Sequence, residues 1–280
     1  MTQSTTPEPR FARDWKTILV IALTVYSVAL CLRLLDYSGW THPFFKVDGE
    51  FILGTHDAYH WVAGAEGTGF AVGQPPSMFV AFFAKLFGVS AAQAGFWLPV
   101  LVASLVGVAT LLWAWTLGGV EAGICAGMLA ALAPGFLNRT RLGYYDTDMV
   151  TLLFPLLTGW AVAFWLKPRL RPGWPLLQRL ISRVKGKDRI KAKGETSLDT
   201  AGDTPVISRE WKGLLWMLGA GLATRYFGTW HGYIDIYSKL VLCVALVLVL
   251  LTARPGYRPL LLWGLSIFGL AAFVGWFGLG

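Results

Sequence analysis

The chain has 280 residues, of which 55% are hydrophobic and 14% are charged, and its mean hydropathy is +0.54. Soluble domains carry about 25% charged residues. This composition excludes an ordinary soluble protein and indicates a membrane protein with long apolar helices. The net charge is +8.

Seven apolar stretches are candidates for membrane-spanning helices, each of which needs about 20 residues. We expect these spans at residues 17–35, 95–117, 120–137, 149–166, 213–229, 236–253 and 260–280. Four of them contain a single charge each, which is Arg33, Glu121, Arg225 or Lys239. The sequence therefore predicts an all-α membrane protein, a polytopic bundle of about seven helices.

Basic residues accumulate on the cytoplasmic side of a membrane protein. With the N-terminus inside, the cytoplasmic segments are residues 1–16, 118–119, 167–212 and 254–259, and they hold 17 of the 24 Lys and Arg residues. The positive charge is thus a sign of topology, not of nucleic-acid binding. We expect the basic loop 167–212 to be partly an interfacial helix and partly a flexible loop on anionic lipid.

The same topology places a long first loop, residues 36–94, and a short loop, residues 138–148, together outside the membrane. A third external turn spans residues 224–239, between the fifth and sixth spans. The last region, residues 213–280, holds the three further spans. The first span lacks a small-residue cleavage site, so we expect it to stay uncleaved.

The three cysteines lie in separate apolar stretches and do not have the spacing of a disulfide framework or a zinc site. They are Cys31, Cys125 and Cys243. We expect them to behave as small apolar residues.

The short external loop contains the string "NRTRLGYYDTDM", residues 138–149, with Asp146 and Asp148 separated by one residue. On an extended segment, alternate side chains share a face, so both carboxylates could approach one cation. Carboxylate oxygens suit Mg²⁺ and Mn²⁺. The alternative is that Asp148 simply caps the fourth span, and the motif alone leaves both interpretations open.

The long first loop contributes "DGEFILGTHDAYHWVAGAEG", in which Asp57 lies among apolar neighbours. His56 and His60 are four residues apart and, with Asp57, resemble a degenerate zinc-protease motif. The stretch lacks the glutamate base and a third ligand at a suitable spacing, so exposed histidines are the better interpretation. Further on, "PSMFVAFFAKLFGV", residues 76–89, is typical of an amphipathic helix that lies on the membrane surface.

Taken together, "GYYDTDM" and "HDAYHWVAGA" resemble the catalytic subunits of oligosaccharyltransferases, especially the single-subunit bacterial type. The turn "GTWHGYIDIY", residues 228–237, is similar to an aromatic element of that family. The resemblance implies a C-type glycosyltransferase fold in the cell inner membrane, with active-site loops that face the periplasm or exterior. It implies transfer of an oligosaccharide from a polyprenyl-diphosphate carrier to asparagine in an N-x-Ser/Thr acceptor polypeptide.

The same resemblance implies a divalent metal, Mn²⁺ or Mg²⁺, as cofactor. Asp57 matches the first-loop carboxylate that binds the metal and contacts the acceptor amide. Asp146 matches the principal ligand of the D-x-D pair, and Asp148 matches its second position, either a ligand or a neighbour of one.

Arg139 matches an arginine just upstream of the D-x-D pair. It could contact substrate, or it could organise the site by pairing with Asp148, and both roles remain open at this stage. Trp230 and Tyr233 match the aromatic turn, which implies a place near the lipid-linked donor.

Family members continue into a soluble domain with a W-W-D-Y-G motif, which this sequence does not contain. We therefore expect the chain to be a fragment, or the first half of a site whose other half comes from a separate chain. The "NRT" string is itself an acceptor sequence, but we expect Asn138 to cap the end of the third span.

Two other functions are compatible with such spans and loops. Another C-type glycosyltransferase would use polyprenyl-phosphate sugars, but it would not predict "GYYDTDM". A non-enzymatic transporter of lipid-linked sugars predicts charges buried in mid-span and repeated halves. The acidic residues gather in the external loops instead, and the sequence has no internal repeat.

Overall fold

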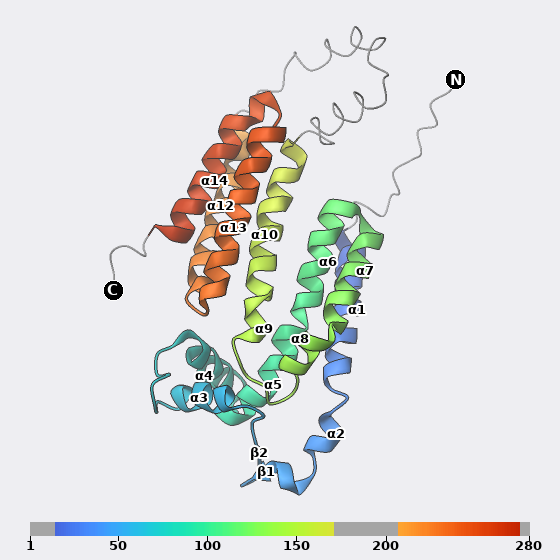
Figure 1. Ribbon diagram of the computed structural model, residues 1–280, viewed down its shortest axis with the longest axis vertical. Coiled ribbons are helices and arrows are strands. Elements are labelled where there is room, and N and C mark those ends of the chain that lie inside the picture. The colour runs from blue at the N-terminus through green and yellow to red at the C-terminus, as the bar shows by residue number, and fades with distance from the viewer. Residues whose placement is uncertain (1–14, 171–206, 275–280) are drawn as a thin grey trace, which may run out of the picture. The chain divides into compact units, whose positions relative to one another are not determined.

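A computed structural model describes residues 15–170 and 207–274, and the chain divides into two compact units. Unit 1 consists of residues 1–160 and 226–237, and unit 2 of residues 161–225 and 238–280. Apart from one short hairpin, the regular structure in the described residues is helical (Figure 1). The predicted all-α class is confirmed.

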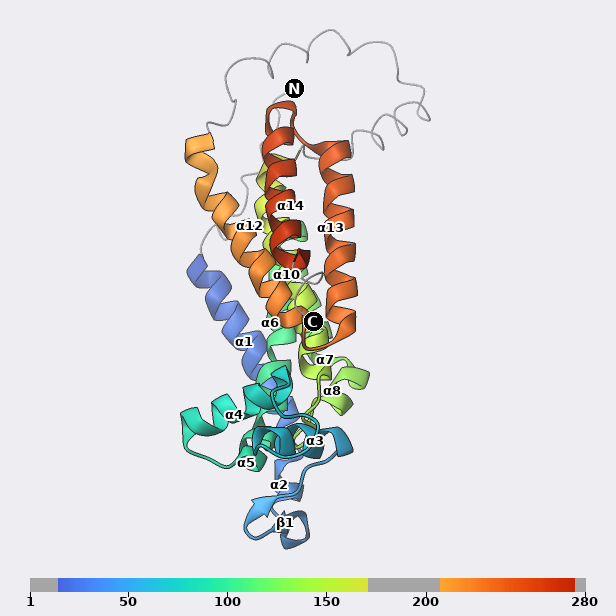
Figure 2. The ribbon, with the colours of Figure 1, turned by 90° about the vertical axis from the view of Figure 1, so that its left-hand side faces the viewer.

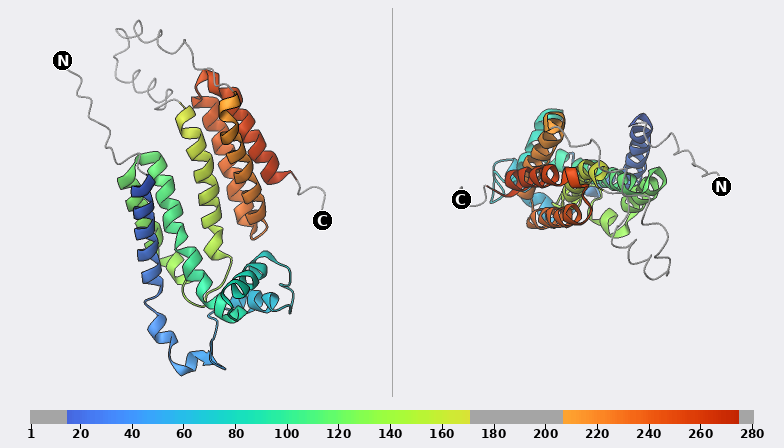
Figure 3. Two further views of the ribbon diagram at one scale, coloured as in Figure 1. Left: turned by 180° about the vertical axis from the view of Figure 1, so that it is seen from behind. Right: turned by 90° about the horizontal axis from the view of Figure 1, so that it is seen from above.

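Three long helices of unit 1 run side by side, as the views from the front and from behind agree (Figures 1 and 3). They are α1 (Trp15–Arg33), α6 (Leu105–Gly118) and α7 (Val120–Leu132). At the α6–α7 contact, a Cβ atom on Gly127 would lie 2.9 Å from the Gly107 carbonyl oxygen. Small residues let helix backbones approach closely in an apolar bundle, which explains why glycine occupies both positions.

The predicted first external loop is folded at one end of unit 1 (Figure 1). Its elements are α2 (Tyr37–Trp40), η2 (Pro43–Phe45), β1 (Lys46–Val47), β2 (Glu50–Phe51), α3 (His56–Ala65) and α4 (Pro75–Phe87). Two prolines begin α4, and Gly88 ends it with a φ of 66°, a left-handed position that favours glycine. The helix predicted here is confirmed, while its place on the membrane surface stays a prediction.

The antiparallel hairpin of β1 and β2 was not predicted. Lys46 pairs with Phe51 and Val47 with Glu50. Asp48 and Gly49 form the turn with φ angles of 52° and 85°. A two-residue Asp-Gly turn with positive φ angles suits the twist of a hairpin.

After Ser90, which caps its N-terminus, α5 (Ala91–Ala103) runs through Ser104 into α6. The third predicted span is divided, because Ala133 leaves the helical conformation and Pro134 begins α8 (Pro134–Arg139). Asn138 is exposed inside α8, and Thr140 is the residue that follows its end. The expectation that Asn138 caps the third span was therefore wrong.

The chain continues through α9 (Asp148–Thr151), α10 (Leu153–Leu166) and η3 (Lys167–Arg169). Beyond the undescribed residues 171–206, on which most of the predicted basic loop falls, come α12 (Ile207–Gly228), α13 (Gly232–Thr252), η4 (Pro255–Tyr257) and α14 (Arg258–Phe273). In unit 2, α12, α13 and α14 lie beside one another (Figure 2). The ring of Trp165 in α10 packs against Gly213 in α12 and Gly264 in α14, so it connects the three helices.

Within the described residues, the seven predicted spans fall mainly on helices, and residues 275–280 of the last span lie outside the described part. A count of seven membrane spans is not confirmed. In the described part, four helices are long and apolar enough to cross a membrane: Trp15–Arg33, Ala91–Gly118, Asp148–Arg169 and Gly232–Thr252. The apolar helices α7 and α14 are shorter, with 13 and 16 residues. At 1.5 Å per residue, α7 rises only about 20 Å, less than the hydrocarbon thickness of about 30 Å. Cys31, Cys125 and Cys243 are free and exposed on their helices, as expected.

Two glycines of α12 give a matched test of packing in unit 2. A Cβ on Gly221 would lie 2.7 Å from the Phe268 carbonyl oxygen, whereas one on Gly219 would meet nothing within 4 Å. We expect Gly221→Ala to lower the free energy of unfolding by about 1–3 kcal/mol through overpacking. Gly219→Ala should change it by less than about 1 kcal/mol, in the stabilising direction, because alanine favours helix. Denaturant unfolding of the purified protein in micelles measures both, and equal effects would contradict the packing.

Candidate functional site

The two predicted external loops contact each other through backbone groups. The Gly54 N–H donates to the Gly143 carbonyl oxygen at 2.9 Å, and the Gly143 N–H donates to the Phe96 carbonyl oxygen at 3.0 Å. Gly143 has a φ of 74°, and a Cβ on Gly54 would lie 2.5 Å from the Tyr144 ring. Glycine at both positions therefore allows the loop that carries Asp146 to pack against the loop that carries Asp57.

Tyr145 fixes the second loop from its other side. Its side chain is fully buried, and its hydroxyl donates to the Pro76 carbonyl oxygen in α4 at 2.9 Å. Burial, followed by the nearby Asp146 charge, raises the pKa of Tyr145 well above its ordinary value. The residue directly before Asp146 is thus anchored to the first loop.

Asp57 lies exposed in the first turn of α3. The Thr55 side chain caps this helix by accepting from the Ala58 N–H at 3.1 Å. A carboxylate in the first turn of a helix is stabilised by the helix dipole, and here it also stays open to solvent. His56 and His60 are exposed on the same helix.

The two carboxylates of the D-x-D pair reach the same guanidinium. Arg139 at the end of α8 donates from Nε to Asp148 Oδ2 at 2.5 Å, and its Nη2 lies 3.6 Å from Asp146 Oδ2. Asp148 is the first residue of α9, whose N-cap is Thr147. The alternative in which Asp148 caps the fourth span was therefore wrong, and its carboxylate is committed to Arg139.

Asp146 is the most enclosed of the three carboxylates, with a side chain that is 17% exposed. It accepts a hydrogen bond from the Thr147 N–H at 2.6 Å. Burial raises the pKa of Asp146, and the charges of Asp148 and Asp57 raise it further, against the hydrogen bonds from Thr147. A negative charge from each of the two loops, Asp57 and Asp148, therefore raises the pKa of Asp146.

Arg139 experiences the same three carboxylates. The hydrogen bond with Asp148 raises the pKa of Arg139 most, and the charges of Asp148, Asp146 and Asp57 also raise it. Its side chain is 65% exposed, so solvent weakens these attractions. Arg139 contacts Asp146 and Asp148 directly, and the negative charge of Asp57 also favours its protonated form.

The donor chemistry of this cluster suits a hard divalent cation. Its oxygen ligands are those that Mg²⁺ and Mn²⁺ prefer. The raised pKa of Asp146 reflects burial first and the negative charges of Asp148 and Asp57 second, and a bound cation would offset both. Within residues 15–170 and 207–274, no three His, Cys, Asp or Glu side chains lie close enough to hold an ion by themselves. Water or further ligands would have to complete the coordination, and the three-carboxylate metal site stays a prediction.

The sequence drew attention to Arg33 only as an interruption of the first span, but this residue supports the second loop. It is 2% exposed at the end of α1. Its Nε donates to Thr140 Oγ1 at 3.2 Å, and its Nη1 donates to the carbonyl oxygens of Ala29 and Ala131 at 3.1 and 3.4 Å. Arg33 thus satisfies a carbonyl at the broken end of α7 and holds the residue that follows Arg139.

Trp230 and Tyr233 lie in different environments. Trp230 is 5% exposed, and its ring centroid lies 5.1 Å from Phe79 and 5.7 Å from Phe154, in the core of unit 1. Tyr233 is 56% exposed and stacks on His231 with a centroid distance of 5.0 Å. Of the two, Tyr233 has the accessible ring face, and the donor-binding role of both stays a prediction.

Residues 76–275 match the family model described as oligosaccharyl transferase STT3, N-terminal. The chain belongs to this family. The resemblance drawn from "GYYDTDM" is confirmed, and the matched STT3 segment contains Arg139, Asp146, Asp148, Trp230 and Tyr233. No curated protein matches the chain.

The STT3 match begins after Asp57. The case for Asp57 as a site residue therefore depends on its sequence context and on its place in the structure. The negative charge of Asp57 raises the pKa of both Asp146 and Arg139, although Asp57 lies in a different loop.

The anchor between Tyr145 and α4 gives a test of how the second loop is held. We expect Tyr145→Phe to lower the free energy of unfolding by about 1–2 kcal/mol, because the buried Pro76 carbonyl loses its donor. The control is Tyr37→Phe, a partly exposed tyrosine with ring contacts to Phe51 and Trp97. Chemical unfolding of both variants measures the difference, and equal stability would argue against the anchor.

Proposed function

We propose that this chain forms the N-terminal membrane region of an oligosaccharyltransferase, which transfers an oligosaccharide from a polyprenyl-diphosphate carrier to asparagine in N-x-Ser/Thr acceptors. The observation that carries the proposal is the pairing of Arg139 with Asp146 and Asp148, on a loop that packs against the loop of Asp57 in a chain of the STT3 family.

The acceptor amide needs activation, because its nitrogen lone pair is delocalised into the carbonyl group. Asp57 is suited to this task. It is an exposed carboxylate at the start of a capped helix, so it can accept hydrogen bonds from the amide N–H groups and orient the nitrogen for attack.

The diphosphate leaving group carries negative charge that the site has to neutralise. A bound Mn²⁺ or Mg²⁺ at Asp57, Asp146 and Asp148 would supply this neutralisation as a Lewis acid. Arg139 serves as a positioning residue, because its contacts with Asp148 and Asp146 orient both carboxylates. This favours the organising role of Arg139 over direct contact with substrate.

The exposed ring of Tyr233 is suited to contact the lipid-linked donor, with Trp230 as its buried support. The distribution of basic residues supports an orientation in the cell inner membrane in which the site faces the periplasm or exterior.

The two other functions remain less well supported. A glycosyltransferase that uses polyprenyl-phosphate sugars and a transporter of lipid-linked sugars could both have four or more apolar helices. Neither explains the family match or the paired loops with three carboxylates.

The proposal predicts the loss of transfer in single aspartate variants. Membranes that carry the chain, supplied with a C-terminal half from the family, are assayed with a lipid-linked oligosaccharide, an N-x-Thr peptide and Mn²⁺. We expect Asp57→Ala and Asp146→Ala each to reduce transfer by roughly 100-fold, in the range found for metal-site residues.

The control is Glu66→Gln, which removes an exposed carboxylate from the other end of α3 and should leave transfer unchanged. Unaltered transfer in the Asp57 or Asp146 variant would overturn the proposed assignment. Transfer that does not respond to chelation of the metal would overturn its cofactor.

A further inference from the structure

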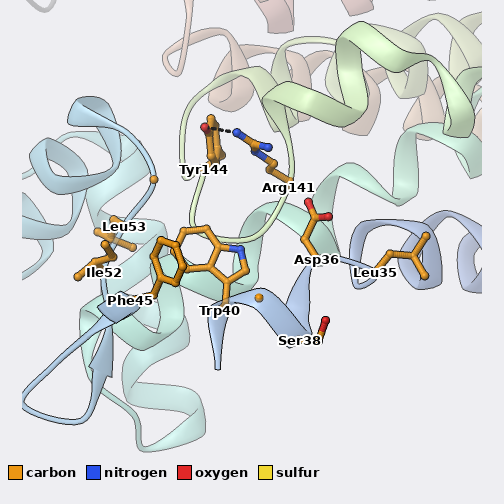
Figure 4. Close-up of a pocket in the computed structure, with 11 residues that line it drawn as sticks. Leu35, Asp36, Ser38, Trp40, Phe45, Ile52, Leu53, Arg141 and Tyr144 are labelled. Carbon is orange, nitrogen blue, oxygen red and sulfur yellow. Dashed lines mark hydrogen bonds between the residues drawn. The ribbon is translucent and has the colours of Figure 1, made fainter. Parts of the chain in front are cut away.

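A cavity of 680 Å³ lies at the junction of the two loops, and none of the roles above uses it. Polar and aromatic side chains share its lining, including Asp36, Ser38, Trp40, Phe45, Arg141 and Tyr144 (Figure 4). Ligand pockets commonly have volumes of about 300–1,000 Å³ with a few placed polar groups. The size and lining of this cavity fit that description.

Arg141 is placed as a donor toward the cavity. Its Nη2 donates to the Tyr144 hydroxyl, and its guanidinium lies 4.4 Å from the centroid of the Tyr144 ring. Its Nε is buried and has no hydrogen-bond partner among the described residues. Because Nε is buried, a ligand in the cavity would approach Arg141 through the other nitrogens of its guanidinium.

Asp36 gives the same cavity an acceptor. Its carboxylate lines the space beside Arg141 (Figure 4). None of the ion pairs found in the described residues joins Asp36 to Arg141. The cavity therefore presents an anion and a cation that do not satisfy each other.

The remaining wall is aromatic and held rigidly. The Trp40 ring packs 5.3 Å from Phe45 and 5.2 Å from Phe96, the latter a buried core residue. Aromatic faces carry partial negative charge and attract the partly positive hydrogens of C–H groups. The wall is thus suited to a flat ligand that has C–H groups on one face.

These features together select one ligand class. An anion would approach the Asp36 carboxylate, and a cation would approach the Arg141 guanidinium. A neutral ligand with many hydroxyl groups can accept from Arg141 and donate to Asp36 with charge-assisted hydrogen bonds, while its C–H face stacks on Trp40. A pyranose sugar has all three properties.

We propose that the cavity between α2, Phe45 of η2, residues 52–54 and the 138–148 loop is a binding subsite for a neutral pyranose oligosaccharide. Gly54 and Tyr144 line it, three residues from Asp57 and two residues from Asp146, so the subsite adjoins the carboxylates. The assignment of this sugar to the transferred glycan rests on the proposed function, whereas sugar binding itself does not.

Saturation-transfer NMR with free sugars tests the subsite. The full chain is placed in lipid nanodiscs, because maltoside detergents would themselves offer a sugar. The probes are N,N′-diacetylchitobiose, cellobiose and maltose, with an N-x-Thr hexapeptide as the alternative ligand. We expect transfer of saturation to the ring protons of at least one sugar, and affinity that falls roughly tenfold in Arg141→Ala and Asp36→Asn, as for one lost charge-assisted hydrogen bond.

The control Lys46→Ala removes a nearby cation that lies over Phe51, outside the cavity lining, and it should bind sugar as the parent does. Asp36 is exposed, so Asp36→Asn tests the subsite even if Arg141→Ala unfolds the protein. Absence of sugar binding, or equal binding in all variants, would overturn the proposal. Binding of the peptide alone, with loss in the same variants, would overturn it in favour of an acceptor site.

Asp57→Ala separates this inference from the proposed function, because it should abolish transfer and leave sugar binding intact. If sugars do not bind while the aspartate variants still lose transfer, the subsite alone is wrong. If sugars bind while those variants keep transfer, the proposed function alone is wrong.

Discussion

The contact between Gly54 and Gly143 is the constraint on which the candidate site depends. Their backbone hydrogen bond brings together two loops separated by almost 90 residues, and neither position has room for a larger side chain without displacing a neighbour. Tyr145 then fixes the second loop to α4 through a buried hydrogen bond. Asp57 and Asp146 are therefore presented by two loops that pack against each other through their backbones.

Two arginines stabilise the second loop in different ways. Arg33 is buried and supports the break between α7 and α8 by satisfying a free carbonyl group and Thr140. Arg139, at the end of α8, is exposed and pairs with both members of the D-x-D motif. The first sets the path of the backbone, and the second compensates part of the negative charge. The two carboxylates that share this arginine belong to the site proposed for a divalent cation.

The sequence predicted most of the helices because apolar runs in this chain are long and are bounded by charges. The family resemblance also drew attention to Asp146 and Arg139, whose Oδ2 and Nη2 atoms lie 3.6 Å apart, and to Asp57, whose role stays a prediction. The break at Ala133–Pro134 was missed, although a proline in an apolar run is a recognised signal for the end of a helix. The hairpin was missed although its Asp-Gly turn is a recognised signal, and the supporting role of Arg33 has no local signature.

A double-mutant cycle on Mn²⁺ binding tests most directly whether Asp57 and Asp146 share one cation. The dissociation constant is measured by electron paramagnetic resonance for the parent chain, Asp57→Asn, Asp146→Asn and the double variant. If both carboxylates act on one ion, the two losses in binding free energy are coupled by about 0.5–3 kcal/mol, the range for groups in direct interaction. Losses that add within about 0.5 kcal/mol, as for independent sites, would contradict a shared metal site.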